Sequence, residues 1–202
     1  MEQTKLRKNS LIIFILIALV YLPSCKRNKK VEAEKDPTEV AETKNEKMFD
    51  AKTDSVDAQF LVDATESNLM EIKMAQLVIS RFSIYDVKDL ASMLLADHTK
   101  LSEEMTNLAL RKAIAIPTEV NKLKDADYKK LDVKQGKGFD NLYCDMMISN
   151  HQTYIRTFEK AAKECADIEI KEWAAKTLAT FRDHLQFSKD CKMKLSKMEK
   201  IK

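Results

Sequence analysis

The chain has three histidines, His98, His151 and His184, and these are the residues whose type and placement best suit chemistry. Each lies in the middle of a long segment of helical periodicity, on the apolar face of that segment. A neutral imidazole is a good metal ligand, because one ring nitrogen carries a free lone pair. One such histidine would ordinarily be a satisfied core residue, but three on separate helices predict one shared metal site.

Four segments of period 3.6 must position these histidines, at residues 55–81, 85–113, 139–165 and 168–198. Two Gly, three Pro and 33% charged residues favour long helices over sheet. Short turns after the first and third segments predict two antiparallel hairpins. The long connection 114–138 predicts a crossover with a short helix near 126–131. We therefore expect an all-α, ferritin-like four-helix bundle over residues 55–200.

The hairpin turns set the heights of the histidines. The turn near 166 places His151 level with His184, and the turn near 82 places His98 opposite Ser67 to Glu71. Glu71 lies on the inner face of its helix, about one turn from the level of His98. Because a buried carboxylate needs a partner, we predict that Glu71 and the three histidines bind one divalent transition metal. Zn²⁺ or Fe²⁺ suits this set best, and Mn²⁺ or Cu²⁺ would also fit.

A standard di-iron centre is not expected, because it needs Glu-x-x-His pairs on the inner helix faces. The residues three positions before the histidines are Leu95, Ile148 and Phe181. Asp97 and Asp183 each precede a histidine directly, and they are candidates to orient the ligands from a neighbouring helix. Solvated or interfacial charges are the alternative interpretation of both acids.

Two cysteines share the inner face with the histidines. Cys144 lies about two helical turns before His151, and Cys191 about two turns after His184, so the two sulfurs should be level. A disulfide is permitted outside the cytoplasm, so a Cys144–Cys191 bridge is predicted, with two small buried core residues as the alternative. Cys165 has no partner at its height and is expected to be a free thiol.

The first 25 residues have the pattern of an export signal. Lys5, Arg7 and Lys8 precede an apolar run, Leu11 to Tyr21, which is shorter than the about 20 residues that span a bilayer. The run ends in Leu22-Pro23-Ser24-Cys25, which resembles a lipoprotein lipobox, so Cys25 would be lipidated. We therefore expect an exported lipoprotein, anchored to a membrane in the periplasm or outer membrane. An uncleaved membrane anchor is the alternative.

Residues 26–54 are rich in Lys, Glu, Thr, Asn and Asp, and they contain few large apolar side chains. Such a composition buries too little surface to offset chain entropy, so a disordered charged tether is expected there. The net charge of the chain is only +3, which does not indicate a nucleic-acid partner. The membrane, contacted through the lipid, is the partner that the sequence predicts.

Several ordered motifs resemble the bacterial ferritin-like domain of unknown function 4142. They are Phe60-Leu61 with Glu71-Ile72, Asp97-His98-Thr99-Lys100, Asn150-His151, and Arg182-Asp183-His184-Leu185, and the resemblance spans roughly residues 55–195. It implies an exported four-helix domain without an established activity. The four predicted ligands fall on motif positions, whereas Asn150 stands where the family usually has Asp.

Two broader functions remain open beside a metal protein of storage, sensing or stress protection. The cluster of Glu71 and the histidines can instead be a structural polar network in a non-catalytic envelope binding or scaffold module. A metal with an open coordination position would also permit hydrolase or oxidoreductase chemistry, although the sequence favours a protein that is not an enzyme.

Overall fold

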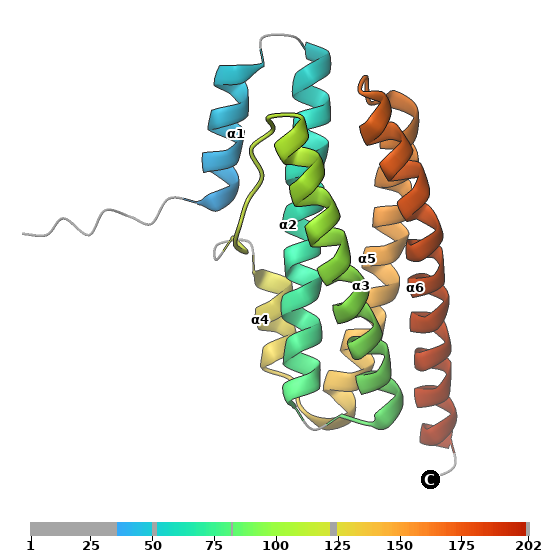
Figure 1. The fold of residues 1–202 in the computed structure, drawn as a ribbon. Coiled ribbons are helices and arrows are strands. Elements are labelled where there is room, and N and C mark those ends of the chain that lie inside the picture. The colour runs from blue at the N-terminus through green and yellow to red at the C-terminus, as the bar shows by residue number, and fades with distance from the viewer. Residues whose placement is uncertain (1–35, 50–51, 82, 122–124, 201–202) are drawn as a thin grey trace, which may run out of the picture. The chain divides into compact units, whose positions relative to one another are not determined.

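A computed structural model describes residues 36–49, 52–81, 83–121 and 125–200, with side chains except those of 52–54 and 199–200. These residues form six α-helices and no strand, as the sequence predicts for an all-α chain (Figure 1). The helices are α1 (Pro37–Met48), α2 (Lys52–Ser80), α3 (Tyr85–Arg111), α4 (Ala126–Asp132), α5 (Gly136–Glu164) and α6 (Ile168–Lys200). Within the described ranges, no helix is both long and apolar enough to cross a membrane.

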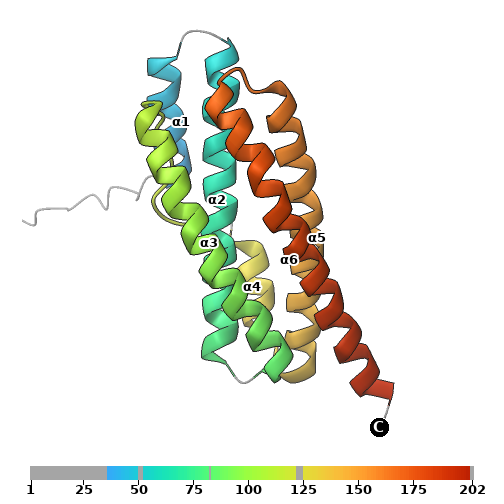
Figure 2. The same cartoon turned by 45° about the vertical axis from the view of Figure 1, so that its right-hand side comes forward.

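The four long helices form two pairs of sequence neighbours. Helix α2 packs along α3 and α5 packs along α6, and each pair is joined by a short turn, so its members are antiparallel. Helix α3 also contacts α6, which brings the two pairs together. Both views show α5 and α6 side by side (Figures 1 and 2). All four helices begin and end within a few residues of the predicted segments.

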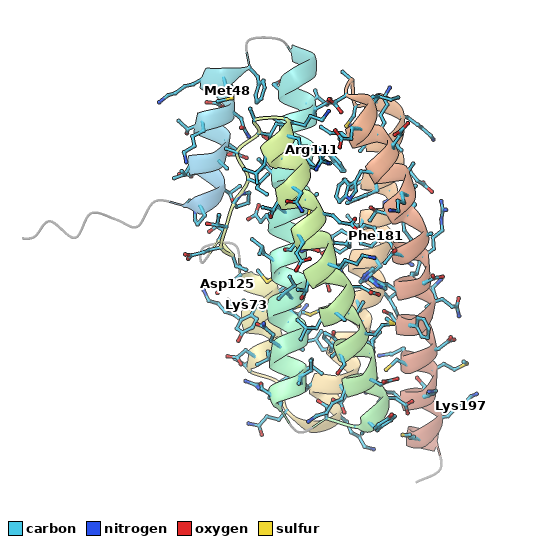
Figure 3. The ribbon with its side chains drawn as sticks, viewed as in Figure 1. Met48, Lys73, Arg111, Asp125, Phe181 and Lys197 are labelled. Carbon is cyan, nitrogen blue, oxygen red and sulfur yellow. The ribbon has the colours of Figure 1, made fainter. Side chains whose placement is uncertain are left out.

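Helix α4 lies in the connection between α3 and α5, where the sequence predicts a short helix. Its Leu131 is completely buried, and the helix packs against α2 and α5. Lys73 of α2 contacts the start of α4 (Figure 3). Its Nζ forms an ion pair with Asp125 Oδ2 at 3.7 Å and lies 4.0 Å from the centre of the Tyr128 ring. The crossover is therefore packed onto α2.

Helix α1 occupies part of the stretch 26–54 that was expected to be a disordered tether. The Asp36 carboxylate accepts a hydrogen bond from Thr38 N at 2.9 Å, and Pro37 suits the first helical turn. Further along, the Asn45 amide pairs with both backbone groups of Ala115, at 2.8 and 2.7 Å. The average composition of the whole stretch does not reveal this local cap or the contact of Asn45 with Ala115. Residues 1–25 and the rest of the tether before 36 lie outside the described residues.

The apolar core consists of two clusters. One, near the turn between α5 and α6, includes Phe60, Leu101, Phe158 and Phe181, and the other, toward the opposite end, includes Met74, Leu94, Tyr143, Cys144 and Cys191. Buried polar residues separate the two clusters on every long helix: Asn68 and Glu71 on α2, His98 on α3, His151 on α5 and His184 on α6. The helices thus position one polar layer between two apolar ones.

Candidate metal centre

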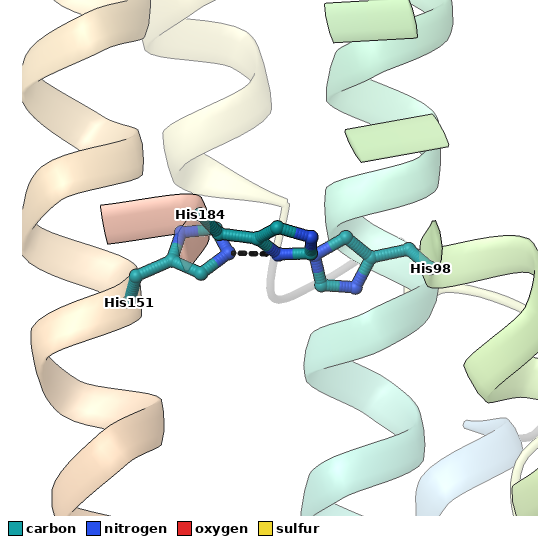
Figure 4. Close-up of side chains that lie close together, drawn as sticks. All are labelled: His98, His151 and His184. Atoms are coloured by element: carbon teal, nitrogen blue, oxygen red, sulfur yellow. Dashed lines mark hydrogen bonds between the residues drawn. The ribbon is translucent and has the colours of Figure 1, made fainter. Parts of the chain in front are cut away.

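The three histidines come from α3, α5 and α6 and meet in this polar layer. Each is at most 1% exposed. One ring nitrogen from each lies within 4.8 Å of the others, so the three could hold one metal ion. Figure 4 shows the rings of His98, His151 and His184 pointing toward one another. The structure thus brings the three histidine side chains together, as the sequence predicts.

Asn68 fixes the orientation and the hydrogen position of the His98 ring. The Asn68 Nδ2 donates to the His98 backbone carbonyl at 2.9 Å and to Ser102 Oγ at 3.0 Å. The Asn68 Oδ1 is therefore the atom that faces His98 Nδ1, at 2.7 Å. Because an amide oxygen only accepts, His98 Nδ1 carries the hydrogen, and Nε2 of the neutral ring is a bare lone pair.

The other two rings are held in the same way. His151 Nδ1 donates to the backbone carbonyl of Met147 at 2.8 Å, and His184 Nε2 donates to Asp97 Oδ2 at 2.9 Å. Both partners are oxygens that accept hydrogen bonds. Neutral metal-binding histidines characteristically donate their outer N–H to a carboxylate or carbonyl in this way.

The inner nitrogens are left facing one another without a hydrogen to share. His151 Nε2 lies 3.0 Å from His184 Nδ1, and His98 Nε2 is buried without a hydrogen-bond partner. Two lone pairs at that distance repel unless a cation lies beside them. The arrangement therefore demands either an added proton or a metal ion.

Burial makes the proton the less favourable cation. Burial lowers the pKa of His98 well below its usual 6.5, and His151 and His184 lower it further. Burial also lowers the pKa of His184, although its hydrogen bond to Asp97 acts in the opposite direction. The free-energy cost of burying a divalent ion is offset by bonds to all three lone pairs at once. A proton can be shared by two of the nitrogens at most.

Glu71 differs from the prediction that made it a fourth ligand. It is 1% exposed, but it does not belong to the group of mutually close ligand atoms. Its Oε1 accepts from Asn150 Nδ2 at 2.8 Å and from Tyr154 Oη at 3.0 Å. The one-turn offset from His98 gives the reason, because Asn68 occupies the matching height instead. Burial raises the pKa of Glu71, while His151 and the two hydrogen bonds act to lower it.

The two candidate orienting acids are placed differently. Asp97 reaches across from α3 to His184 on α6, as described above. Asp183 is exposed, and it affects His184 only through its charge. Asn68 and the Met147 carbonyl were missed by the sequence interpretation, although the hairpin register already placed Asn68 opposite His98. No sequence pattern marks a backbone carbonyl as a partner.

The cysteine pair lies one layer away from the histidines. Cys144 Sγ and Cys191 Sγ are 3.3 Å apart, so the two residues are level as predicted, and both are free thiols in the structure. The Cys144 thiol donates to Cys191, which lowers the pKa of Cys191. Cys165 is also free, and burial raises its pKa to about 12. The disulfide stays a prediction.

Fold and site together define an all-helical protein with a buried cluster of three histidines. The chain belongs to the family described as a domain of unknown function, DUF4142, whose pattern matches residues 42–190. This confirms the family that the sequence motifs resemble. A search of curated proteins gave no match.

Two solved structures resemble the chain in fold. A DUF305 fragment from Deinococcus radiodurans aligns with a TM-score of 0.61 at 13% identity, over 68% of this chain and 95% of that one. A DUF305 protein from Streptomyces coelicolor, described as secreted, aligns with a TM-score of 0.60 at 18% identity, over 69% of this chain and 92% of that one. At these identities the likeness concerns the fold alone.

Proposed function

We propose that the chain binds one divalent transition metal through His98 Nε2, His151 Nε2 and His184 Nδ1. The observation that carries the proposal is the set of outer hydrogen bonds, to Asn68, Met147 and Asp97, which turns all three free nitrogens inward. Neutral imidazoles already oriented by such partners are the ligands that zinc and iron sites use. Storage, sensing or protection against metal stress would follow from one buried, exchangeable ion.

Zn²⁺ and Fe²⁺ remain the preferred ions for this ligand set. Both accept imidazole nitrogen, and Zn²⁺ commonly takes three protein ligands and one exchangeable fourth. Glu71 lies outside the group of close ligand atoms, so it would act as a neighbouring anion: its charge interacts with His151, its Oε1 is held by Asn150 and Tyr154, and its Oε2 is buried without a hydrogen-bond partner. A cation in the centre would in turn stabilise the ionised form of Glu71.

Metal analysis of the full chain, purified without a histidine tag, tests the proposal. We expect one Zn or Fe ion per chain, and loss of that ion in His151→Ala. Asp183→Ala is the matched control, because Asp183 is exposed beside His184 and should leave the metal content unchanged. Metal content at background in the natural chain after loading, or equal content in His151→Ala, would reject the site.

A non-catalytic envelope scaffold is the second candidate, and one observation favours it. Side-chain hydrogen bonds join α2 to α3 through Asn68, and α2 to α5 through Glu71, and neither needs a metal. Thermal unfolding with and without a strong chelator separates the two candidates. A structural metal lowers the midpoint when it is removed, whereas a scaffold unfolds at the same temperature.

We also propose that α2, α3, α5 and α6 form a ferritin-like four-helix bundle on a lipid-anchored envelope protein. The long connection that carries α4 between the two hairpins supports the first part. The basic, apolar and Cys25 pattern supports the second. Cys25→Ser should abolish lipid labelling and move the protein out of the membrane fraction, and unchanged labelling would contradict the anchor.

A further inference from the structure

A cavity of about 150 Å³ leads from the surface between α2 and α5 toward His98. Exposed Asp63, Thr153 and Thr157 line its outer part, and buried Asn68 and His98 line its inner part. It therefore connects solvent with the polar layer that holds the three histidines.

His98 lines the inner part of this cavity, and its ring carries a buried nitrogen without a hydrogen-bond partner. His98 is 1% exposed, and its Nε2 has no hydrogen-bond partner. Because Nδ1 is occupied by Asn68, Nε2 is the atom of this ring that a metal or a ligand can use. A metal held by three histidines keeps a fourth position for an exchangeable ligand, and this cavity is lined by one of those histidines, His98.

The size and the walls of the cavity restrict what can enter. An apolar cavity of about 150 Å³ is large enough to bind a benzene-sized molecule. Four aromatic side chains form part of the walls here, those of Tyr154, Phe158, Trp173 and Phe181. Such walls favour a planar ring that packs against their faces and edges.

Charge restricts the ligand further. The Asp63 carboxylate at the mouth repels anions, and a bound metal ion would repel a cationic ligand at the inner end. A neutral molecule meets neither penalty. A lone pair on the ring would give it a bond to the metal in addition to its contacts with the walls.

We propose that this cavity binds a neutral, single-ring heteroaromatic ligand whose lone-pair nitrogen takes the open position of the metal. The inference rests on the proposed metal centre. It makes that centre a receptor for a small molecule, with the α2–α5 opening as the route of entry.

Imidazole, at a pH where it is neutral, is the probe. It is titrated into the full chain loaded with Co²⁺, whose visible absorption reports a change of metal ligands, and into the Zn²⁺ form, where fluorescence is read. Trp173 is the only tryptophan in the sequence and lines the cavity, so its fluorescence reports occupancy there. We expect both signals to change with the same midpoint.

Two variants locate the binding. Thr157→Phe places a ring at the mouth and should weaken imidazole binding about tenfold, which corresponds to about 1.4 kcal/mol. Thr106→Phe makes the same exchange at an exposed position of α3 outside the cavity, and it should not change the midpoint. Both residues are exposed on helices, so both variants are expected to fold and to bind Co²⁺.

Three results would overturn the inference. Co²⁺ absorption that does not respond to imidazole means a closed metal centre, with the metal proposal intact. Absorption that responds without a change in Trp173 fluorescence, or equally in both variants, means entry elsewhere. Absence of any Co²⁺ spectrum removes the metal centre, and the inference falls with it.

Discussion

Replacing Asn68 with leucine removes the acceptor that holds the His98 hydrogen on Nδ1. The side chains are similar in size, so the change acts mainly on hydrogen bonding. In the structure the Asn68 amide makes three contacts of 2.7 to 3.0 Å, two with His98 and one with Ser102. Without Oδ1, the ring can move its hydrogen to Nε2, the nitrogen that would face the metal.

The expected loss follows from the outer partners of metal-binding histidines. Removing one such partner typically weakens metal affinity about 10- to 100-fold, which corresponds to about 1.4–2.7 kcal/mol. The His98 carbonyl keeps its bond within α3, so losing the Asn68 donor costs about 0.5–1.5 kcal/mol of folding stability in addition. Because stability and affinity both change, the affinity must be measured on protein shown to be folded by circular dichroism.

The assay is competition for Zn²⁺ against a coloured chelator. Asn150→Leu is the matched control, because Asn150 bonds to Glu71 and not to a histidine, and its affinity should stay within about threefold of the natural chain. Asn68→Asp keeps an acceptor for Nδ1 and should recover most of the affinity. Equal affinities for Asn68→Leu and the natural chain, or an equal loss in Asn150→Leu, would refute the reasoning.

Three further predictions concern stability and redox state. Oxidised glutathione should remove the two thiol hydrogens and join Cys144 to Cys191 in a disulfide. The bond closes a loop of 47 residues and should raise the free energy of unfolding by about 4 kcal/mol. A mass measurement in which both thiols are still alkylated after this treatment would contradict the prediction. Because burial lowers the pKa of His98, the stability tied to its neutral form is complete above pH 6.5 and is lost as the pH falls through the folded-state value. Urea unfolding of metal-free protein should therefore lose up to about 1.4 kcal/mol more per pH unit below 6.5 in the natural chain than in His98→Gln, and parallel profiles would refute this. The Asp57 carboxylate accepts hydrogen bonds from the backbone N–H groups of Ala166 and Asp167, at 2.7 to 3.1 Å, just before α6. Asp57→Ala should therefore lower the free energy of unfolding by about 1–3 kcal/mol, whereas Asp63→Ala, at an exposed position, should lower it by less than about 0.5 kcal/mol. Equal losses in the two variants would be inconsistent with a stabilising role of Asp57.

The long helices were predictable because their signals are local. Apolar residues repeat with the helical period, and breaks in the pattern coincide with the short turns before Tyr85 and Ile168. Helix α1 was not predicted, because it depends on a local cap and on contacts with distant residues, such as that of Asn45 with Ala115, 70 residues away. The average composition of residues 26–54 cannot reveal a contact with a residue so far away in the sequence.

The candidate site was predictable in part, as the fold was. Helical phase placed the three histidines inward, and the hairpin turns placed His151 and His184 at one level. Their nitrogens are 3.0 Å apart in the structure. The position of Glu71 was not predictable to the accuracy a metal ligand requires, because its offset from His98 is about one helical turn, or about 5.4 Å, and its carboxylate lies outside the group of close ligand atoms.

By itself, the sequence determined that three imidazoles face the interior of a helical protein and that His151 and His184 are level, since period and turn length are properties of neighbouring residues. Only the tertiary structure decided which nitrogen of each ring faces the centre. That choice depends on acceptors brought in by other turns and helices: Asn68 from α2 for His98, Asp97 from α3 for His184, and the Met147 carbonyl for His151. A hydrogen bond forms over about 3 Å, so its partners are settled by packing between helices rather than by the order of residues along them.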